Sequence, residues 1–515
     1  MGDTQSFPFI NPFLMSRLKK LAGDTVLYGM SSIVGRMLNY FLVPLYTTYL
    51  SAAEYGVVTE LYAYVAFFMV LFTFGMETTF FRFVSQDKSS AKSIFNQITS
   101  LVLVIDTALA LLLCALATPI MNYLEFPGKE GYVYALAAIL FLDGVSAIPF
   151  AKLRIEGKAK KFAMTKMINI LINMSLNIVL LVGINAILEG KFMPEQAAWV
   201  NSWYSPAVGP AIVVFSNLVA SAANWIMLGS AFRSFKFQWN KEVINPIVRY
   251  GYPLLFMGVA GTTNEMFSRL MLKKILPEGF YEGFSNQEIL GIFGACYKLA
   301  IFMNLAIQAY KYAAEPFFFN NSGDKNSPAL IGKVTHIFIA FGAVAYVGIV
   351  ANLDIIAIFT LRQAEYKLAL DAVPVLLMAN LLLGVYYNLS MWYKLTDRTY
   401  VGTYLAVGGA ILTILLNLML IPSYGYMGSA YVTFIVYLLM TVASYILGQK
   451  YYPIPYQMVR GMLYLVLAGL LGHFCFQLKL DNFYFLKGIQ LLIFLIFAGM
   501  VFILERSTLR KNRRA

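Results

Sequence analysis

The chain has 515 residues, of which 59% are hydrophobic and only 13% are charged. An average soluble protein carries about twice that share of charged residues, and the mean hydropathy of +0.68 is correspondingly high. This composition excludes a disordered chain, a fibrous protein and an ordinary soluble enzyme, and it predicts an all-α polytopic membrane protein. A net charge of +13 would suggest nucleic-acid binding in a soluble protein, but here it is interpreted as membrane topology and no nucleic-acid partner is expected.

Cysteine and histidine are too sparse to build a metal centre. Cys114, Cys296 and Cys475 each lie alone in an apolar run, so neither a disulfide framework nor a CxxC site is expected. Only His336 and His473 are histidines, which argues against a histidine metal site. The sequence therefore predicts no metal, no cofactor and no catalytic residues, and the chain is not expected to be an enzyme.

Long apolar runs predict fourteen membrane-spanning helices, because a helix needs about 20 residues to cross the bilayer core. The predicted spans are 24–50, 56–84, 94–121, 132–153, 163–188, 207–229, 250–275, 289–318, 332–358, 372–393, 400–421, 426–449, 456–477 and 486–505. The first run is too long for a cleavable signal and is expected to be a true span.

Lys and Arg residues are concentrated in every second connection. With a cytoplasmic N-terminus, the densest clusters fall on the cytoplasmic side, as the positive-inside rule requires. These clusters are Lys152, Arg154, Lys158, Lys160 and Lys161, and Arg506, Arg510, Lys511, Arg513 and Arg514. Topology anchoring is the expected role, with anionic-lipid binding as the alternative. Both termini are predicted to be cytoplasmic tails, 1–23 and 506–515.

The sequence repeats itself after about 240 residues, which predicts two related lobes. Matches in four places carry the repeat. Residues 85–90 match 322–327 and residues 209–215 match 428–434, while Gly56, Tyr62, Gly144 and Asn177 recur as Gly291, Tyr297, Gly384 and Asn417. Each repeat holds six spans, an even number, so both halves enter the membrane from the same side. The predicted domains are an N-lobe over 24–229, a cytoplasmic linker over 230–249, a C-lobe over 250–449 and two additional helices within 450–505.

Charged side chains inside the spans predict a polar cavity, because such residues normally face water or a partner. Nine of the twelve lie in spans 1, 2, 7 and 8, which are equivalent helices of the two repeats. The twelve are Arg36, Glu60, Glu77, Arg82, Asp106, Asp143, Lys166, Glu265, Arg269, Lys298, Lys311 and Glu315. A cavity between the lobes, lined by these four spans, is therefore expected.

Three of the cations are candidates for substrate binding, namely Arg36, Arg269 and Lys298. Arginine can hold a phosphate bidentately with a permanent charge. Two alternatives stay open: Arg36 could pair with an acid of span 2, and Arg269 could pair with Glu265 four residues earlier.

The remaining ionisable residues are candidates for coupling or gating, because a carboxylate removed from water can hold a proton at neutral pH. This set comprises Glu60, Glu77, Asp106, Asp143, Glu265, Lys311 and Glu315. Lys311 and Glu315 lie four residues apart, so an ion pair or an inner gate is expected there. Arg82 and Lys166 lie near the inner face and are expected to anchor the helices by snorkelling.

Several short motifs resemble a known family. Span 1 is preceded by LKKL (18–21) and ends with VPLYTTYL (43–50), SAAEYG (51–56) follows, and YGYMGSA (424–430) begins span 12. With the span count and the repeat, these resemble bacterial polysaccharide flippases, the O-antigen and capsule translocases of the multidrug/oligosaccharidyl-lipid/polysaccharide exporter superfamily. The resemblance extends over essentially the whole chain.

The resemblance implies two six-helix lobes plus two helices in the bacterial cytoplasmic membrane. It implies export of an undecaprenyl-diphosphate-linked oligosaccharide, whose diphosphate would be held by cavity cations and whose tail would lie near spans 13 and 14. Arg36 occupies the first-span position where related flippases tend to place a cavity cation. Further expected partners are H⁺ or Na⁺ as a coupling ion, the bilayer itself and the polysaccharide polymerase machinery.

Three other functions remain as alternatives. A multidrug or cation antiporter of the same superfamily typically has twelve spans and an acidic cavity, whereas fourteen spans and a charge-balanced cavity are predicted here. A lipid II-type flippase shares the predicted fold and is not separated by the sequence. A membrane transferase or polymerase usually needs sizeable outer loops or a histidine or carboxylate constellation, and neither is evident.

Overall fold

The computed structural model describes residues 34–511, apart from Arg36, Asn39, Lys88, 205–207, Ser234, 321–325 and Asp397. The predicted candidates Arg36 and the side chain of Glu315 thus lie outside the described part of the chain. The described residues form helices and no strands, which confirms the all-α prediction.

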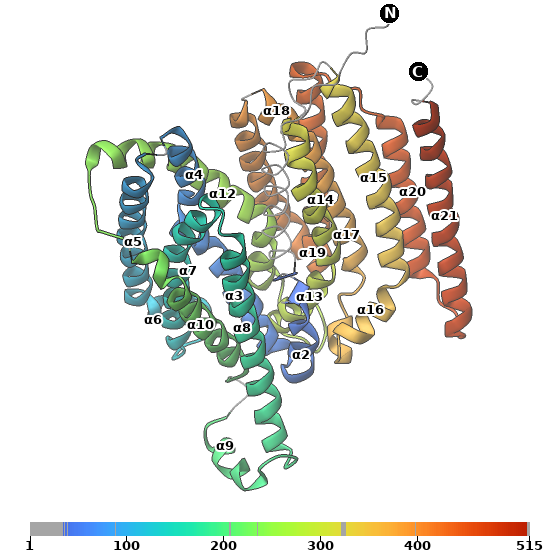
Figure 1. The fold of residues 1–515 in the computed structure, drawn as a ribbon. Coiled ribbons are helices and arrows are strands. Elements are labelled where there is room, and N and C mark those ends of the chain that lie inside the picture. The colour runs from blue at the N-terminus through green and yellow to red at the C-terminus, as the bar shows by residue number, and fades with distance from the viewer. Residues whose placement is uncertain are drawn as a thin grey trace, which may run out of the picture.

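The first half of the chain folds into one bundle, the N-lobe, on the left of Figure 1. Its helices are α2 (Leu42–Tyr49), α3 (Ala52–Thr73), α4 (Met76–Gln86), α5 (Ala91–Ala115), α6 (Ala117–Tyr123), α7 (Gly131–Ile155), α8 (Ala159–Leu188), α9 (Ala197–Trp203), α10 (Val208–Met227) and α11 (Gly229–Phe232). A 3₁₀ turn, Pro194–Gln196, precedes α9.

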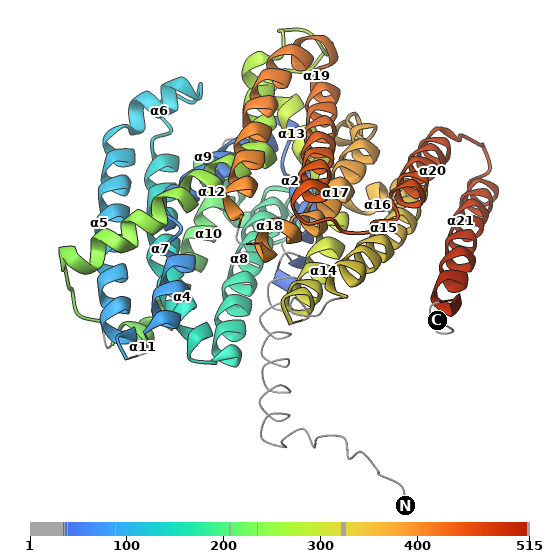
Figure 2. The ribbon, with the colours of Figure 1, turned by 90° about the horizontal axis from the view of Figure 1, so that it is seen from above.

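The second half forms the C-lobe on the right of Figure 1, except for the first turns of α12 (Lys241–Ile275), which lie with the N-lobe on the left. Its other helices are α13 (Asn286–Leu299), α14 (Ile301–Asn320), α15 (Ser327–Ala351), α16 (Leu353–Thr360), α17 (Ala372–Leu389), α18 (Met391–Leu395), α19 (Thr399–Tyr451), α20 (Met458–Gln477) and α21 (Phe483–Lys511), with a 3₁₀ turn at Ala364–Lys367. Helices α20 and α21 pack against α15 at the edge of this lobe, as Figure 2 shows.

Eleven described helices are long and apolar enough to cross a membrane, compared with the fourteen spans predicted. Three features produce the difference. Span 1 begins in the part of the chain that is not described, and α12 is not among the eleven. Helix α19 combines the predicted spans 400–421 and 426–449, which meet at Gly425 with non-helical backbone angles (φ 59°, ψ −137°). The count of fourteen stays a prediction.

The two lobes share their internal packing, which supports the predicted repeat. Helix α5 packs on α7 as α15 packs on α17, and α7 packs on α10 as α17 packs on α19. The side-chain oxygen of Asn177 on α8 accepts a hydrogen bond from Tyr46 on α2 at 3.1 Å. Its repeat equivalent, Asn417 on α19, donates to Ser268 on α12 at 3.0 Å. The two asparagines therefore link equivalent pairs of helices.

Helices α3 and α13, which are equivalent in the repeat, cross at the centre of the molecule with their backbones in contact. A Cβ atom added to Gly291 would lie 2.0 Å from the carbonyl oxygen of Ala52, and one added to Gly56 would lie 2.1 Å from that of Gln287. Both helices begin with a capping box, formed by Ser51 with Glu54 and by Ser285 with Glu288. We call this end of the bundle the Ser51 end.

The predicted span 56–84 is interrupted in the structure. Phe74 and Gly75 both adopt left-handed backbone angles (φ 47° and 65°) and separate α3 from α4. Gly251 of α12 packs against this break, because a Cβ atom there would lie 2.3 Å from the Cε atom of Met76. An uninterrupted apolar run gave no indication of the break.

Helix α12 joins the two lobes and begins earlier than predicted, within the expected linker 230–249. Its first turns belong to the N-lobe, since Ile244 and Ile247 are buried among residues of α4, α5 and α7. Its later turns pack against α19 of the C-lobe. Figure 2 shows this helix running from one lobe toward the other.

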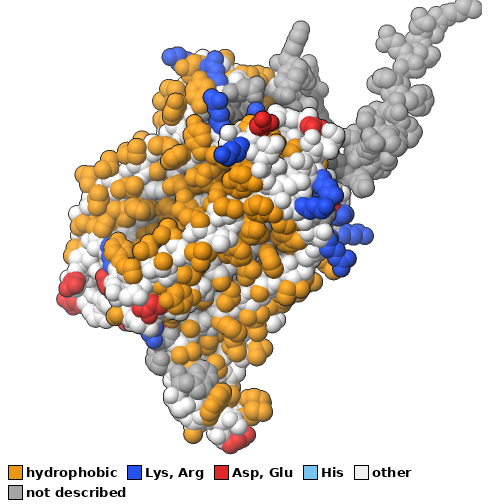
Figure 3. All heavy atoms as spheres, turned by 90° about the vertical axis from the view of Figure 1, so that its left-hand side faces the viewer, with side chains coloured by type: hydrophobic (Ala, Val, Ile, Leu, Met, Phe, Trp, Pro, Cys, Tyr) orange, Lys and Arg blue, Asp and Glu red, His pale blue; other side chains and the backbone are white. Residues whose placement is uncertain are grey.

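The outward surface of the N-lobe has the character of a membrane protein. Figure 3 shows hydrophobic side chains over most of this face, with the charged ones gathered toward its edges. Large exposed apolar residues such as Leu111 on α5 and Val179 on α8 are expected where lipid is the solvent.

The crossing of α3 and α13 yields a stability prediction. Gly291→Ala should lower the thermal unfolding midpoint of the detergent-purified protein, because overpacking against backbone costs about 1–3 kcal/mol. Gly183→Ala on α8 is the matched control, since a Cβ atom there has no neighbour within 4 Å, and it should be neutral or slightly stabilising. Equal effects of the two variants would contradict the close crossing.

Candidate functional site

Two groups of charged residues lie where the lobes meet. The first, which we call the cation cluster, consists of Arg269 on α12 and Lys298 on α13 with Glu265. The second, which we call the latch, consists of Glu60, Glu125, Lys273 and Lys274.

Arg269 is held inside the protein with unused hydrogen-bonding capacity. Its side chain is only 7% exposed, and its guanidinium carbon lies 3.8 Å from the centre of the Tyr297 ring on α13, a cation–π contact. The Nε atom is buried and has no hydrogen-bond partner among the described residues. A buried donor without a partner is costly, so an anionic ligand at this position would be stabilised.

Lys298 follows Tyr297 directly and adds a second positive charge. Lys298 is exposed to solvent, whereas Tyr297 and Leu299 on either side of it are buried. Arg269 repels its charge and Glu265 attracts it. Two cations that repel each other favour a bound anion between them.

The structure thus brings together three predicted site residues, Glu265, Arg269 and Lys298. Among the described residues, Glu265 and Arg269 form no direct ion pair, so the i,i+4 pairing considered from the sequence is not what holds the arginine. Tyr297, the repeat equivalent of Tyr62, takes that role through its ring.

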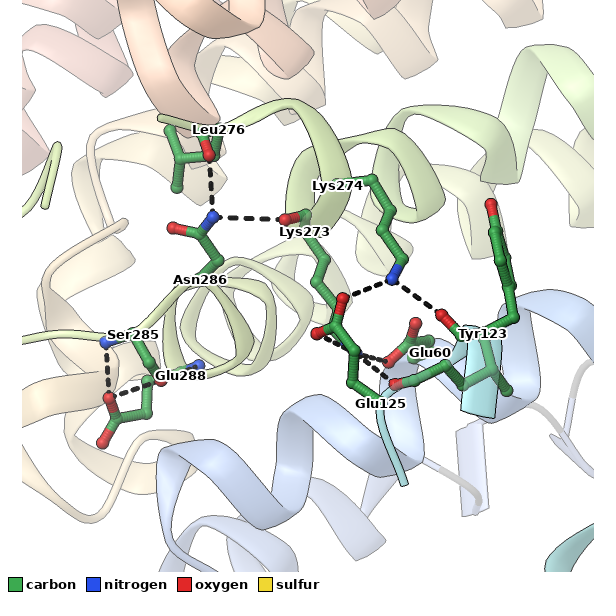
Figure 4. Close-up of polar contacts among 10 residues, drawn as sticks. Glu60, Tyr123, Glu125, Lys273, Lys274, Leu276, Ser285, Asn286 and Glu288 are labelled. Carbon is green, nitrogen blue, oxygen red and sulfur yellow. Dashed lines mark hydrogen bonds and ion pairs between the residues drawn. The ribbon is translucent and has the colours of Figure 1, made fainter. Parts of the chain in front are cut away.

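The latch connects the N-lobe to the end of α12 (Figure 4). The Lys273 ammonium lies 3.0 Å from the Glu60 carboxylate of α3, and both side chains are almost completely buried. The same ammonium donates to the carbonyl of Leu124 at 2.7 Å. Lys274 donates to Glu125 at 2.6 Å and to the carbonyl of Tyr123 at 2.8 Å. These bonds tie α12 to α3 and to the segment after α6, at the Ser51 end.

The latch spans the boundary between dry and wet surroundings. Glu125 has a 64% exposed side chain, and the hydrogen bond from Lys274 is the largest of the effects that lower the pKa of this loop carboxyl. Glu125 is ionised at neutral pH, and the lowered pKa keeps it ionised in more acidic solution than an ordinary glutamate. Its contribution to the latch is therefore present at neutral pH and is lost as the pH falls through that lowered pKa.

Lys273 is a buried charge of this candidate site that the sequence did not reveal. It lies at the end of predicted span 7 and was not counted among the buried charges, although its side chain is as inaccessible as that of Glu60. The excess of acids in the N-lobe was a usable signal, because a buried carboxylate needs a cation. Residues 60 and 273 are too far apart in sequence for that signal to identify the partner.

The structure places other predicted residues away from the interface between the lobes. Glu77 pairs with Arg154 of the predicted basic cluster, and both side chains are more than two-fifths exposed. Arg82 lies over the Tyr250 ring at 4.3 Å. The expectation that these two charges of span 2 line the cavity therefore finds no support.

Three further candidates lie within single lobes. Asp143 interacts electrostatically with Lys166 in the N-lobe. Lys311 lies 4.6 Å from the centre of the Tyr387 ring in the C-lobe. Asp106 on α5 is completely buried, and neither of its carboxyl oxygens has a hydrogen-bond partner among the described residues.

Comparison with known proteins places these features in a family. A sequence profile described as "Polysaccharide biosynthesis protein" matches residues 48–310, slightly more than half of the chain. The chain belongs to the polysaccharide biosynthesis protein family. This confirms the family suggested by the motifs. Among curated proteins, no sequence matches the chain.

Solved structures show which fold this member of the polysaccharide biosynthesis family has. The lipid II flippase MurJ in an inward closed conformation superposes with a TM-score of 0.70 at 13% identity, over 94% of this chain and 100% of that chain. An inward-facing multidrug resistance MATE transporter of the MOP superfamily gives 0.56 at 11% identity, over 83% and 94%. The MATE multidrug transporter DinF-BH gives 0.56 at 16% identity, over 84% and 95%. The fold is thus shared with a flippase and with multidrug transporters.

A double-mutant cycle tests the latch. Glu60→Leu and Lys273→Met should each lower the free energy of unfolding by about 3–5 kcal/mol, because each leaves a buried charge without its partner. The double variant should recover most of the loss, which thermal unfolding in detergent would show.

Glu77→Leu is the control for this cycle, because it breaks an exposed ion pair that contributes about 1 kcal/mol or less. Strictly additive losses in the Glu60 and Lys273 variants would contradict a direct interaction between the two side chains.

Proposed function

We propose that this polysaccharide biosynthesis protein moves a polyprenyl-diphosphate-linked oligosaccharide across the bacterial cytoplasmic membrane. The observation that carries the proposal is the cation cluster between the lobes. Its Arg269 Nε atom has no hydrogen-bond partner in the described part of the chain, and Lys298 adds a second positive charge close by. Arg36 of span 1 is a third proposed ligand and lies outside the described residues.

The chemistry of such a substrate fits the cluster. A diphosphate and a chain of sugar hydroxyls cannot cross about 30 Å of hydrocarbon without partners. Arginine offers a phosphate paired hydrogen bonds, and lysine adds a compact charge. The hydrocarbon tail needs no polar path and would stay in the bilayer beside the lobes while the headgroup crosses.

The latch supports alternating access as the mechanism. A transporter with parallel repeats exposes its site to one side by rocking its lobes. The ion pairs of Glu60 and Glu125 with α12 hold the lobes together at the Ser51 end. With both termini cytoplasmic, that end faces outward, and the headgroup would enter the cation cluster from the cytoplasmic side.

Three alternative functions differ from this proposal in the molecule on which the protein would act. A multidrug antiporter of this fold would carry organic cations, which two adjacent cations at the site disfavour. A lipid II-type flippase would use the same diphosphate chemistry on a different sugar, so only the substrate distinguishes it. A membrane transferase or polymerase would act on the sugar chain itself, so a chemically altered product would distinguish it from a transporter.

Coupling and partners complete the proposal. The substrate must interact differently with the two conformations, or an H⁺ or Na⁺ gradient must bias them. Asp106 and Asp143 are the proposed candidates for ion coupling in the N-lobe. A polysaccharide polymerase would act on the exported product.

The first functional prediction concerns the cation cluster. Arg269→Ala and Lys298→Ala should each reduce surface polysaccharide about 10- to 100-fold, since a charged hydrogen bond contributes about 1.5–3 kcal/mol, and lipid-linked oligosaccharide should accumulate in the cytoplasmic leaflet. Lys191→Ala in an exposed loop is the control. Normal surface polysaccharide in correctly inserted variants would exclude the cluster from the transport step, and drug sensitivity with intact polysaccharide after gene deletion would favour the antiporter.

A second functional prediction concerns the latch. Reversing one charge, as in Lys274→Glu, should open the Ser51 end, because it places like charges opposite each other. A cysteine introduced by Gln287→Cys, at the α3–α13 crossing, should then react several-fold faster with an impermeant maleimide added outside the cell.

The charge-swapped variant Glu125→Lys with Lys274→Glu should restore slow labelling, and protein without the added cysteine gives the background. If the labelling rate is the same in all variants, the latch does not hold the Ser51 end closed. If labelling occurs only from the cytoplasmic side, the proposed orientation is wrong.

A further inference from the structure

Asp106 is isolated in the interior of the N-lobe. It is 0% exposed, and both carboxyl oxygens lack hydrogen-bond partners among the described residues. It fits into a space left by Gly144 of α7, where a Cβ atom would lie 2.3 Å from the Asp106 Oδ2 atom. The same point lies 3.2 Å from the Cβ atom of Phe72 on α3, so the carboxyl group is enclosed between α5, α7 and α3.

Among the described residues, the charged groups on the neighbouring helices do not act on Asp106. The helices packed against α5 are α3, α4, α6, α7 and α12. Their charged residues are Glu54, Glu60, Glu77, Arg82, Asp143, Lys152, Arg154, Lys241, Glu242, Arg249, Glu265, Arg269, Lys273 and Lys274. Within the described chain, none of them interacts electrostatically with Asp106. An ionised carboxylate in such a place would lose its hydration without any compensation, so the carboxyl group in this conformation carries a proton.

The repeat shows that the fold does not require a carboxylate here. The equivalent of Gly144 in the C-lobe is Gly384, and its neighbours are Phe338 of α15 and Ile307, both apolar. Because α15 packs on α17 as α5 packs on α7, an apolar residue satisfies the same packing. An unpaired acid that the architecture can do without is a candidate functional residue.

Asp106 also lies beside the break between α3 and α4. Phe72, which together with Asp106 closes the space beside Gly144, precedes by two residues the left-handed pair Phe74 and Gly75. The other side of this break is packed against Gly251 and Leu254 of α12, the helix that passes from the N-lobe to the C-lobe. The packing of α5 on α3, and of α3 on α12, thus connects Asp106 with the inter-lobe helix around a segment that is already bent.

We infer that Asp106 is a proton-binding site of the N-lobe, and that its ionisation loosens Phe72 and the α3–α4 break, which shifts α12 between two positions. Binding transfers one proton from hydronium to a carboxylate oxygen and leaves a water molecule, and release reverses this transfer on the other side of the membrane. The inference rests on the proposed function only for its role in transport, because proton binding itself can be measured without a substrate.

Hydrogen exchange on the purified protein in lipid nanodiscs tests the inference. Comparing variants at one pH removes the intrinsic effect of pH on exchange. At alkaline pH, peptides covering residues 70–86 should exchange several-fold faster in the wild type than in Asp106→Asn, which stays neutral. At mildly acidic pH the two proteins should coincide. Asp87→Asn is the control, since Asp87 is an exposed carboxyl after α4 whose pKa is lowered to about 2, and it should follow the wild type at both pH values.

A second variant covers the case in which Asp106→Asn does not fold. Gly144→Ala would displace the carboxyl group from its enclosure, so fast exchange over 70–86 should appear already at acidic pH. Identical exchange in the wild type and Asp106→Asn at both pH values, or an unchanged pattern in Gly144→Ala, would overturn the inference. If the wild-type protein differs from Asp106→Asn in exchange as expected but transports no lipid-linked oligosaccharide, the proposed function is refuted. The proton-binding site would still be supported.

Discussion

The whole arrangement depends on the cost of an ionised side chain in hydrocarbon, which has to be met by a partner, by water or by a proton. The chain uses each of these solutions at a different place. Glu60 is buried with Lys273, Lys298 is reached by solvent, and Asp106 is enclosed with no hydrogen-bond partner in the described part of the chain. Paired, hydrated and isolated charges thus have different tasks, and their surroundings indicate which task each one has.

The same cost explains why the latch can open at all. A completely buried ion pair resists separation, because both charges would remain in a dry interior. Glu125, however, belongs to the same group and has a mostly exposed side chain, so water is already present at one edge of the latch. Separation of the lobes from that edge would hydrate Lys274 first and Lys273 afterwards. The close crossing of Gly56 and Gly291 then limits how far α3 and α13 can slide while they remain in contact.

Much of the fold was predictable, because hydropathy and repetition survive in a single sequence. The match of Gly56 with Gly291 and that of Asn177 with Asn417 predicted the repeat. Only the structure shows that the glycines mark a backbone contact and that the asparagines link equivalent helix pairs. The pairing of buried charged side chains could not be predicted from the sequence in this way. Whether Glu60 meets Arg36 or Lys273 depends on the rotation and crossing of helices, which the chain distance between charges does not encode. The break at Phe74 was not predicted, because a straight helix and a bent one can have the same apolar sequence pattern.

Comparison of the two lobes separates what the architecture requires from what it merely tolerates. Features present in both repeats, such as the serine caps and the glycine crossing of α3 and α13, satisfy backbone geometry that any protein of this shape must satisfy. A feature present in one repeat only has no such explanation. Asp106 facing Gly144, where the other lobe presents Phe338 to Gly384, is of this second kind. The C-lobe thereby serves as an internal comparison, because an apolar residue fills the space equivalent to that of Asp106 there. The acid is not needed for packing, and proton binding remains as the reason for its presence.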